Sequence, residues 1–198
     1  MKTQLIISVK IFAVFTVLCG IVYPLLITGF AQLVFPAKAN GSLIVLGNKV
    51  VGSELIGQKF DREDYFWSRP SATDYSSMPS GGSNLGPTSE KLKQQVEERK
   101  AKWNASNPAV GNEPIPSEML LTSASGLDPH ISPKAALMQV DRIAKVRQFS
   151  NDHKQLLIGT VNELSEAPQF EILGEKRINV LVLNLALDKL DGKNLNHK

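Results

Sequence analysis

The stretch from Ile11 to Phe35 reads IFAVFTVLCGIVYPLLITGFAQLVF and contains no charged side chain. An α-helix rises about 1.5 Å per residue, so about 20 apolar residues cross the roughly 30 Å hydrocarbon core of a bilayer. This stretch is longer than that, and a membrane helix tolerates its interior Gly20 and Pro24. The sequence therefore predicts one transmembrane helix over residues 11–35.

Two other interpretations of this stretch are weaker. A signal peptide has an apolar region of about 7–15 residues, which is shorter, although AKA at Ala37–Ala39 resembles a cleavage site. A lipid anchor on Cys19 would normally follow a small residue, and here Leu18 precedes the cysteine. We therefore interpret the stretch as a permanent membrane anchor.

The flanking charges predict the orientation of this anchor. Lys2 and Lys10 precede the apolar stretch, and cytoplasmic flanks of membrane helices are enriched in lysine and arginine. Lys38 follows it, but long domains are translocated largely regardless of their charge. We expect a single-pass protein of the cytoplasmic (inner) membrane, with residues 1–10 in the cytoplasm and residues 36–198 forming an extracytoplasmic domain.

The composition of that domain excludes several classes of function. All 19 Asp and Glu residues follow Phe35, as do all but two of the 22 Lys and Arg residues, so the domain is almost neutral. A nucleic-acid-binding protein would show a basic stripe instead. Cys19 is the only cysteine, which excludes an intrachain disulfide and a zinc site built on several cysteines. His130, His153 and His197 are too far apart for a metal-binding repeat.

The first half of the domain combines a hairpin, a long loop and a helix. Gly47-Asn48 separates two apolar runs in SLIVLGNKVVG (residues 42–52), which indicates a β-hairpin. Residues 69–87 are dominated by Gly, Pro and Ser, and such a long segment is usually a functional loop or a linker. A helix is expected directly after it, capped by Thr88 or Ser89.

The second half begins with a helix over SPKAALMQVDRIAKVRQF (residues 132–149), with Ser132 as its cap and Pro133 at its first position. Another helix is expected from Ser150 or Asn151 to about Leu164. In the first of these helices the periodicity places a set of residues on or beside the buried face: Ala136, Leu137, Val140, Ile143, Ala144, Val146 and Arg147.

The end of the chain is predicted to form a second hairpin. FEIL (residues 170–173) and INVLVLNLAL (residues 178–187) flank a turn at Gly174-Glu175. Both alternating faces of residues 178–187 are apolar, which is typical of a strand buried on both sides. The sequence thus predicts an α+β protein, in which one N-terminal transmembrane helix precedes a mixed α/β domain.

The glycine-rich loop before residue 88 raises the question of phosphate binding. A Walker-type loop requires a lysine after its last glycine, but Pro87 and Thr88 follow Gly86. A dinucleotide fingerprint requires a strand directly before the glycines, and here a Pro- and Ser-rich loop precedes them. We therefore favour a structural or docking loop over a phosphate site.

Signals for nucleophilic catalysis are also incomplete. Gly82-Ser83-Asn84 begins like a nucleophile elbow, but Leu85 stands where the closing glycine belongs. Asp128, His130 and Ser132 lie close in sequence, yet they are better explained as a turn and a helix cap. Gln139 is polar among apolar neighbours, and a hydrogen-bonded or exposed glutamine on the flank of a helix is the simpler explanation. None of these patterns marks an enzyme.

Three separated motifs now point to a family. FWSRPSATDYSSMPSGGSNLGPTS (residues 66–89), SGLDPHISPKAALMQVDRIAKVR (residues 125–147) and INVLVLNLALDKL (residues 178–190) occur in this order. With the N-terminal helix, they resemble the C subunits of Kdp potassium-transporting P-type ATPases. Ser68, where a glycine is common, and Val146, where a small residue is common, are mild departures from the family pattern.

The resemblance implies a non-catalytic subunit of an ATP-driven, high-affinity potassium import complex. Its partners would be a potassium-selecting pore subunit, a P-type subunit phosphorylated by ATP and a small membrane subunit. The chain itself lacks the Asp-Lys-Thr-Gly phosphorylation sequence. We expect it to support assembly and activity, with no cofactor of its own.

The resemblance also implies an alternative role, as a catalytic chaperone that raises the ATP affinity of the P-type subunit. The family positions that would contact nucleotide correspond to Gln139 and Arg142 here. An extracytoplasmic domain cannot meet cytoplasmic ATP, so the predicted topology favours assembly instead. A third hypothesis is an anchored module that binds an extracytoplasmic solute.

On the assembly hypothesis, the 69–87 loop docks on the pore subunit. Its candidate contact residues share a position in or beside the glycine-rich stretch and are Arg69, Tyr75, Gly81, Gly82, Asn84 and Leu85.

Overall fold

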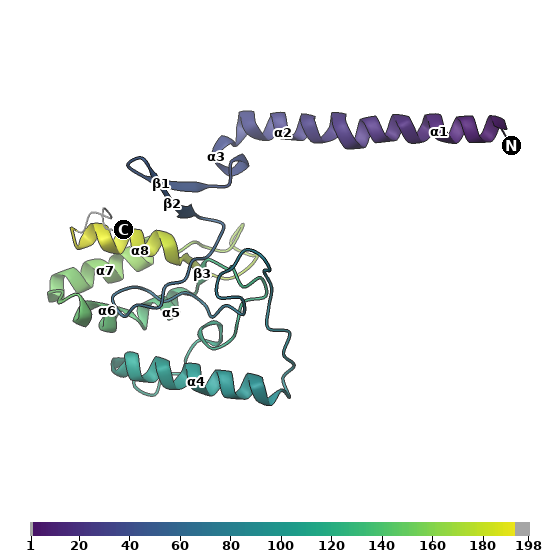
Figure 1. The fold of residues 1–198 in the computed structure, drawn as a ribbon. Coiled ribbons are helices and arrows are strands. Elements are labelled where there is room, and N and C mark those ends of the chain that lie inside the picture. The colour runs from purple at the N-terminus through teal and green to yellow at the C-terminus, as the bar shows by residue number, and fades with distance from the viewer. Residues whose placement is uncertain (1, 193–198) are drawn as a thin grey trace. The chain divides into compact units, whose positions relative to one another are not determined.

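The computed structural model describes residues 2–192, so His197 lies outside the described part. The chain forms two compact units, Met1–Leu43 and Ile44–Lys198. Figure 1 shows the elements in chain order, which are α1 (Lys2–Val17), a π-helical turn η1 (Leu18–Val22), α2 (Tyr23–Val34), α3 (Pro36–Ala39), β1 (Leu43–Leu46), β2 (Lys49–Ser53), α4 (Glu90–Ser106), the 3₁₀ turns η2 (Pro108–Val110) and η3 (Ser117–Met119), β3 (His130–Ile131), α5 (Pro133–Leu137), α6 (Val140–Val146), α7 (Asn151–Glu163), β4 (Ile178–Asn179) and α8 (Val180–Leu190).

The first unit confirms the predicted apolar helix. Lys2–Val34 is one continuous helical rod of 33 residues, long and apolar enough to cross a membrane, and none of its most apolar window is buried in the protein. It begins nine residues before the predicted start at Ile11, because nothing in residues 2–10 breaks a helix. The placement of residues 1–10 and 36–198 on opposite sides of the membrane stays a prediction.

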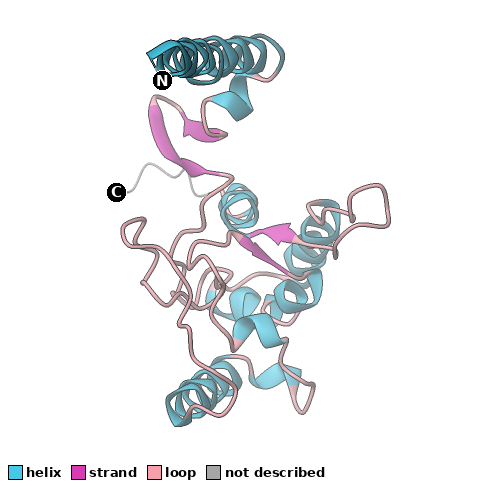
Figure 2. Ribbon diagram, turned by 90° about the vertical axis from the view of Figure 1, so that its right-hand side faces the viewer, coloured by secondary structure: helices cyan, strands magenta, loops and turns pink. Residues whose placement is uncertain are grey.

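The second unit confirms the α+β prediction with very little sheet. The predicted hairpin forms from β1 and β2 around Gly47, whose positive φ of 59° suits the tight turn. A second small sheet pairs β3 with β4 in antiparallel register, with His130 opposite Asn179 and Ile131 opposite Ile178. Helices and loops make up the rest of the unit (Figure 2).

The predicted strand over residues 178–187 is wrong, because only Ile178–Asn179 is extended and α8 follows. The Asn179 side chain caps the helix by accepting the Val182 N–H at 3.2 Å. The buried residues of α8 recur at helical spacing, at Val180, Leu183, Asn184, Leu187 and Asp188. The predicted hairpin with residues 170–173 is therefore also absent, and that segment makes only a single bridge between Gln169 and Leu173.

The predicted helix over residues 132–149 forms as two short helices. Ser132 caps α5 by accepting the Ala135 N–H at 3.1 Å, as expected. A turn at Met138-Gln139 then separates α5 from α6 and rotates the later residues. Of the expected core positions, Leu137 in α5 and Val146 in α6 are 39% and 43% exposed, while Gln139 in the turn is buried.

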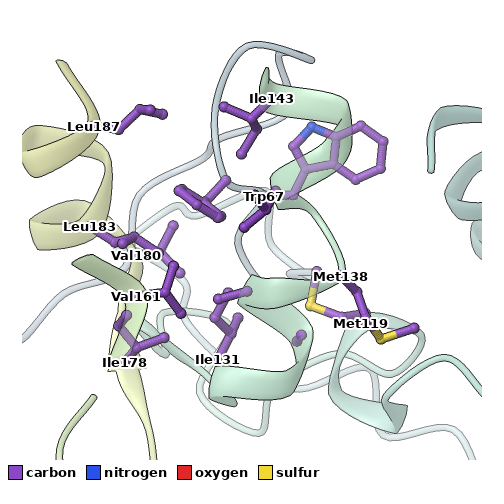
Figure 3. Close-up of a cluster of buried hydrophobic side chains, with 14 of the residues drawn as sticks. Trp67, Met119, Ile131, Met138, Ile143, Val161, Ile178, Val180, Leu183 and Leu187 are labelled. Carbon is purple, nitrogen blue, oxygen red and sulfur yellow. The ribbon is translucent and has the colours of Figure 1, made fainter. Parts of the chain in front are cut away.

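The core lies where α7 packs against α5, α6 and α8. Figure 3 shows side chains from these helices and from both strands of the second sheet converging, including Ile131, Ile143, Val161, Ile178 and Leu183. Each of these five side chains is at most 2% exposed. Burial of such side chains stabilises a fold by about 1.5–3 kcal/mol each, so this cluster anchors the second unit.

The 36-residue segment between β2 and α4, residues 54–89, contains no helix or strand (Figure 2). It ends at Ser89, which caps α4 by accepting the Leu92 N–H, as predicted. Only Trp103 of α4 is buried, and it packs edge-on against Trp67 with ring centroids 6.2 Å apart. The long loop therefore joins the core through its own residues near Trp67.

Candidate functional site

Residues 62–67 form a turn and then enter the core at Phe66 and Trp67, without a helix or strand. Phe66 is fully buried and Trp67 is 7% exposed. Buried backbone N–H and C=O groups need hydrogen-bond partners, and the segment supplies one such bond itself, from the Tyr65 N–H to the Arg62 carbonyl at 3.3 Å. Side chains from other elements take this role, and they include both residues of the predicted nucleotide site.

Gln139 holds the end of this segment. Its Oε1 accepts the Trp67 N–H at 2.7 Å and an Arg142 Nη2–H at 2.8 Å, and its Nε2 donates to the Ala135 carbonyl at 3.1 Å. Gln139 is fully buried. Its side chain therefore makes three hydrogen bonds within the chain, as a buried structural glutamine does.

Arg142 binds the beginning of the segment and stacks on the Trp67 ring, with 4.3 Å between its Cζ and the centroid. Burial lowers its pKa to about 10, so the guanidinium stays charged at neutral pH. Every N–H of the guanidinium has an oxygen acceptor; these are Asn107 Oδ1 at 3.1 Å, Arg62 O at 3.5 Å, Tyr65 O at 3.1 Å, Gln139 Oε1 at 2.8 Å and the Glu63 carbonyl.

Arg147 and Asn184 also bind the backbone of residues 62–67. Arg147 Nε donates to the Asp64 carbonyl at 2.7 Å, and its Nη2 pairs with Asp188 at 2.8 Å. Asn184 accepts the Phe66 N–H at 2.9 Å and donates to the Phe66 carbonyl at 3.0 Å. We call Gln139, Arg142, Arg147 and Asn184 the polar clamp, because together they bind the backbone of residues 62–67.

The polar clamp fixes the point from which the predicted docking loop starts. Arg69 Nη1 binds Asp128 Oδ2 at 2.7 Å, and the Tyr75 hydroxyl donates to the Arg69 carbonyl. Burial raises the pKa of Asp128, but hydrogen bonds from His130 and Arg69 outweigh it and lower that pKa to about 2. Asp128 is therefore ionised at neutral pH and gives Arg69 a charged partner.

The glycine-rich part of the loop lies against residues 123–126. A Cβ on Gly82 would come within 3.2 Å of the Ala124 carbonyl, and one on Gly126 within 2.8 Å of the Gly81 carbonyl. Asn84 is exposed with a positive φ of 54°, and Leu85 is half-buried. The structure thus makes Arg69 and Tyr75 the base of the loop and packs the glycines closely on a second loop, leaving Asn84 at the surface.

A cavity of about 560 Å³ opens beside Arg69. Asp128, His130 and Ser132 also line it, and its wall is formed by residues 167–169 and 173–177. Among residues 2–192, no three His, Cys, Asp or Glu side chains gather as a metal site would require. The lining of this cavity thus combines charged and polar side chains.

The sequence singles out Gln139 and Arg142 but does not identify the other two residues of the polar clamp, Arg147 and Asn184. The sequence predicts that Arg147 lies on or beside a buried helix face, which gives it no hydrogen-bond partner, and that Asn184 lies in a strand. The available signal was the pair Asn184 and Asp188, two polar residues four apart in an apolar run. That spacing is typical of a helix with one polar position facing the interior.

Comparison with known proteins matches nearly the whole chain to one family. The family described as "KdpC: K+-transporting ATPase, c chain" matches residues 5–189. A "Potassium-transporting ATPase KdpC subunit" of Burkholderia vietnamiensis (strain G4) is 47% identical over 195 residues, covering 97% of this chain and 99% of that protein. A protein of the same description from Rhodopseudomonas palustris (strain TIE-1) is 48% identical over 187 residues, covering 87% and 90%.

Proposed function

Because this chain belongs to the KdpC family, the c chains of the K+-transporting ATPase, we propose that it is a non-catalytic subunit that supports assembly and activity of the complex. Its N-terminus lies in the cytoplasm and its second unit lies on the outer side of the membrane. Its partners are the potassium-selecting pore subunit, the ATP-phosphorylated P-type subunit and a small membrane subunit.

The observation that carries this proposal is the exposed apolar helix Lys2–Val34 on a chain whose other unit holds a preformed loop. Of its most apolar window, 0% is buried among the residues that the structure describes. The polar clamp and the Arg69–Asp128 ion pair bind the segment from which the loop starts. Preorganised loops bind partners with a smaller loss of conformational entropy. An anchor and a rigid loop suit a docking subunit.

Direct contact of Gln139 and Arg142 with ATP is the alternative implied by the family resemblance. It requires both side chains to leave the core, where they are 0% and 5% exposed. It also requires the Trp67 N–H and the Glu63 carbonyl to lose their buried partners. Each unsatisfied buried group costs about 1–3 kcal/mol. The geometry therefore favours the assembly role.

Deleting residues 2–35 tests the proposed function. We expect the truncated chain to be lost from the complex that is purified through a tag on the pore subunit, and high-affinity potassium uptake to fall at least tenfold. The reason is that the helix supplies the membrane contacts of this subunit. A full-length chain with Phe12→Leu, which keeps the helix apolar, is the control. Wild-type uptake by the truncated chain would contradict the proposal.

A further inference from the structure

The chain leaves the membrane helix through a folded connector. After Phe35, α3 makes one turn, and the Ser42 N–H bonds to the Ala37 carbonyl at 2.9 Å. The Asn40 side chain exchanges two hydrogen bonds of 3.2 Å with the Gln32 side chain, which lies in the last turn of α2. Asn40 therefore lies beside the end of the membrane helix, and the connector does not lead the chain away from it.

The β1–β2 hairpin begins close to this point. Its first residue, Leu43, is three residues after Asn40 and belongs to the same compact unit as the membrane helix. Three residues extend at most about 11 Å. The polar head-group layer on each side of the hydrocarbon is roughly 5–8 Å thick. Because the predicted membrane span ends at Phe35, the hairpin starts within reach of this layer.

The hairpin exposes apolar side chains. Leu43 and Val45 lie two residues apart in β1, so their side chains point to the same side of the strand, and they are 56% and 54% exposed. Ile44 and Leu46, which alternate with them, are half-buried. Val50 in β2 is 52% exposed. A two-stranded hairpin is at best marginally stable in water, so a surface that covers these side chains would stabilise it.

The charge of this segment differs from that of the rest of the chain after the membrane helix. Residues 36–53 contain Lys38 and Lys49 but no Asp or Glu, and the first acidic residue of the whole chain is Glu54. Residues 54–198 carry all 19 acidic residues and all but four of the 22 Lys and Arg residues. A surface of anionic phospholipids attracts lysine and repels carboxylates. Apolar side chains enter the boundary between its head groups and acyl chains.

The far end of the hairpin is fixed to the second unit. Gln58 Nε2 donates to the Val51 carbonyl at 2.9 Å. A Cβ on Gly52 would come within 2.7 Å of Leu181 Cδ2 in α8, so β2 packs closely on that helix. A lipid contact made by the hairpin would therefore restrain the second unit at the membrane surface.

We propose that the β1–β2 hairpin lies on the phospholipid surface, with Leu43, Val45 and Val50 at the boundary of the acyl chains and Lys38 and Lys49 beside lipid phosphates. The partner is lipid because the segment follows the membrane helix directly, exposes apolar side chains and carries positive charge alone. The inference rests on the proposed function in one respect, since it requires that the helix span the bilayer. It does not depend on the other subunits.

The full chain in lipid nanodiscs tests this contact. A Cys19→Ala chain receives one fluorophore-labelled cysteine, either Val45→Cys on the hairpin or Leu156→Cys on α7. Leu156 is the matched control, because it is 56% exposed and lies in the same unit as Val45. The discs contain phosphatidylglycerol and phosphatidylethanolamine, part of it with a nitroxide at the top of an acyl chain. We expect nitroxide quenching at position 45 to be at least about threefold stronger than at position 156.

An added carboxylate tests the chemistry of the contact. Leu43→Asp places a negative charge at the lipid surface, so it should reduce the quenching of the Val45→Cys label to the level of the control. Leu156→Asp should leave that quenching unchanged. Both leucines are exposed, so neither substitution removes a core side chain. The fluorescence of the buried Trp67 and Trp103 in the unlabelled variants reports that the second unit stays folded.

Several outcomes would overturn the inference. Equal quenching at positions 45 and 156 would show that lipid contacts the second unit without preference. Quenching at position 45 that disappears in the complete complex would show that a protein subunit covers the hairpin. A Leu25→Cys label in α2 reports insertion of the helix. Strong quenching there without quenching at position 45 refutes this inference alone, whereas no quenching at either position refutes the membrane anchor and with it the proposed function.

Discussion

Replacing Arg147 with methionine is expected to lower the free energy of unfolding of the second unit by about 3–5 kcal/mol. The side chains of Arg147 and Asp188 are 1% and 2% exposed and pair at 2.8 Å. Without the arginine, the Asp188 carboxylate would be a buried charge that keeps, among the described residues, the Tyr65 hydroxyl as its side-chain donor, at 2.9 Å. The Asp64 carbonyl would also lose a hydrogen bond.

Tryptophan fluorescence during urea unfolding of the full chain in detergent measures this effect. Trp67 and Trp103 are the only tryptophans, and both are buried in the second unit. Asp141→Asn is the control, because it breaks the more exposed ion pair with Lys154 and should cost less than about 1 kcal/mol. An Arg147→Met/Asp188→Leu variant should recover much of the loss. A loss below about 1 kcal/mol for Arg147→Met would contradict the account.

Replacing Gln139 with alanine is expected to cost about 2–3 kcal/mol, because the Trp67 N–H and one Arg142 N–H would be left buried without an acceptor. Gln139→Glu keeps an acceptor at the same place, beside the Arg142 guanidinium. It loses the Nε2 donor to the Ala135 carbonyl, so it should cost about 1 kcal/mol, less than Gln139→Ala, measured in the same unfolding experiment.

This pair of variants also distinguishes a structural Gln139 from a nucleotide ligand. On the structural account, Gln139→Glu leaves the KM of the complex for ATP unchanged, while Gln139→Ala weakens assembly in parallel with its loss of stability. A glutamine that contacts ATP predicts the opposite, since a carboxylate beside the phosphates would raise that KM. An increase of tenfold or more for the stable Gln139→Glu variant would rule out a purely structural role.

Much of the fold could be predicted because its signals are local. The membrane helix follows from a long uncharged stretch, and the starts of α4, α5 and α7 follow from Ser89, Ser132 and Ser150, each of which caps its helix. A capping serine satisfies N–H groups within its own first turn, so it needs no distant residue. Such signals can be found in a sequence without knowledge of the fold.

The helix α8 and the turn between α5 and α6 could not be predicted, because they depend on contacts between segments distant in sequence. Residues 178–187 are apolar on both alternating faces, and a short apolar run fits a buried strand or a buried helix equally well. Two residues favour the helix in the folded chain. Asn179 caps it, and Asn184 on its buried face binds Phe66, which is 118 residues away. The turn at Met138-Gln139 also depends on a distant contact, because Gln139 lies between the two helices and binds the Trp67 N–H.

The sidedness of the second unit tests the central claim most directly. Glu97 is exposed on α4, so Glu97→Cys in a Cys19→Ala chain gives one accessible thiol. We predict that a membrane-impermeant maleimide labels this cysteine in cells with an intact cytoplasmic membrane. Labelling only after the membrane is broken would contradict the account, because the docking loop would then lie in the cytoplasm together with ATP.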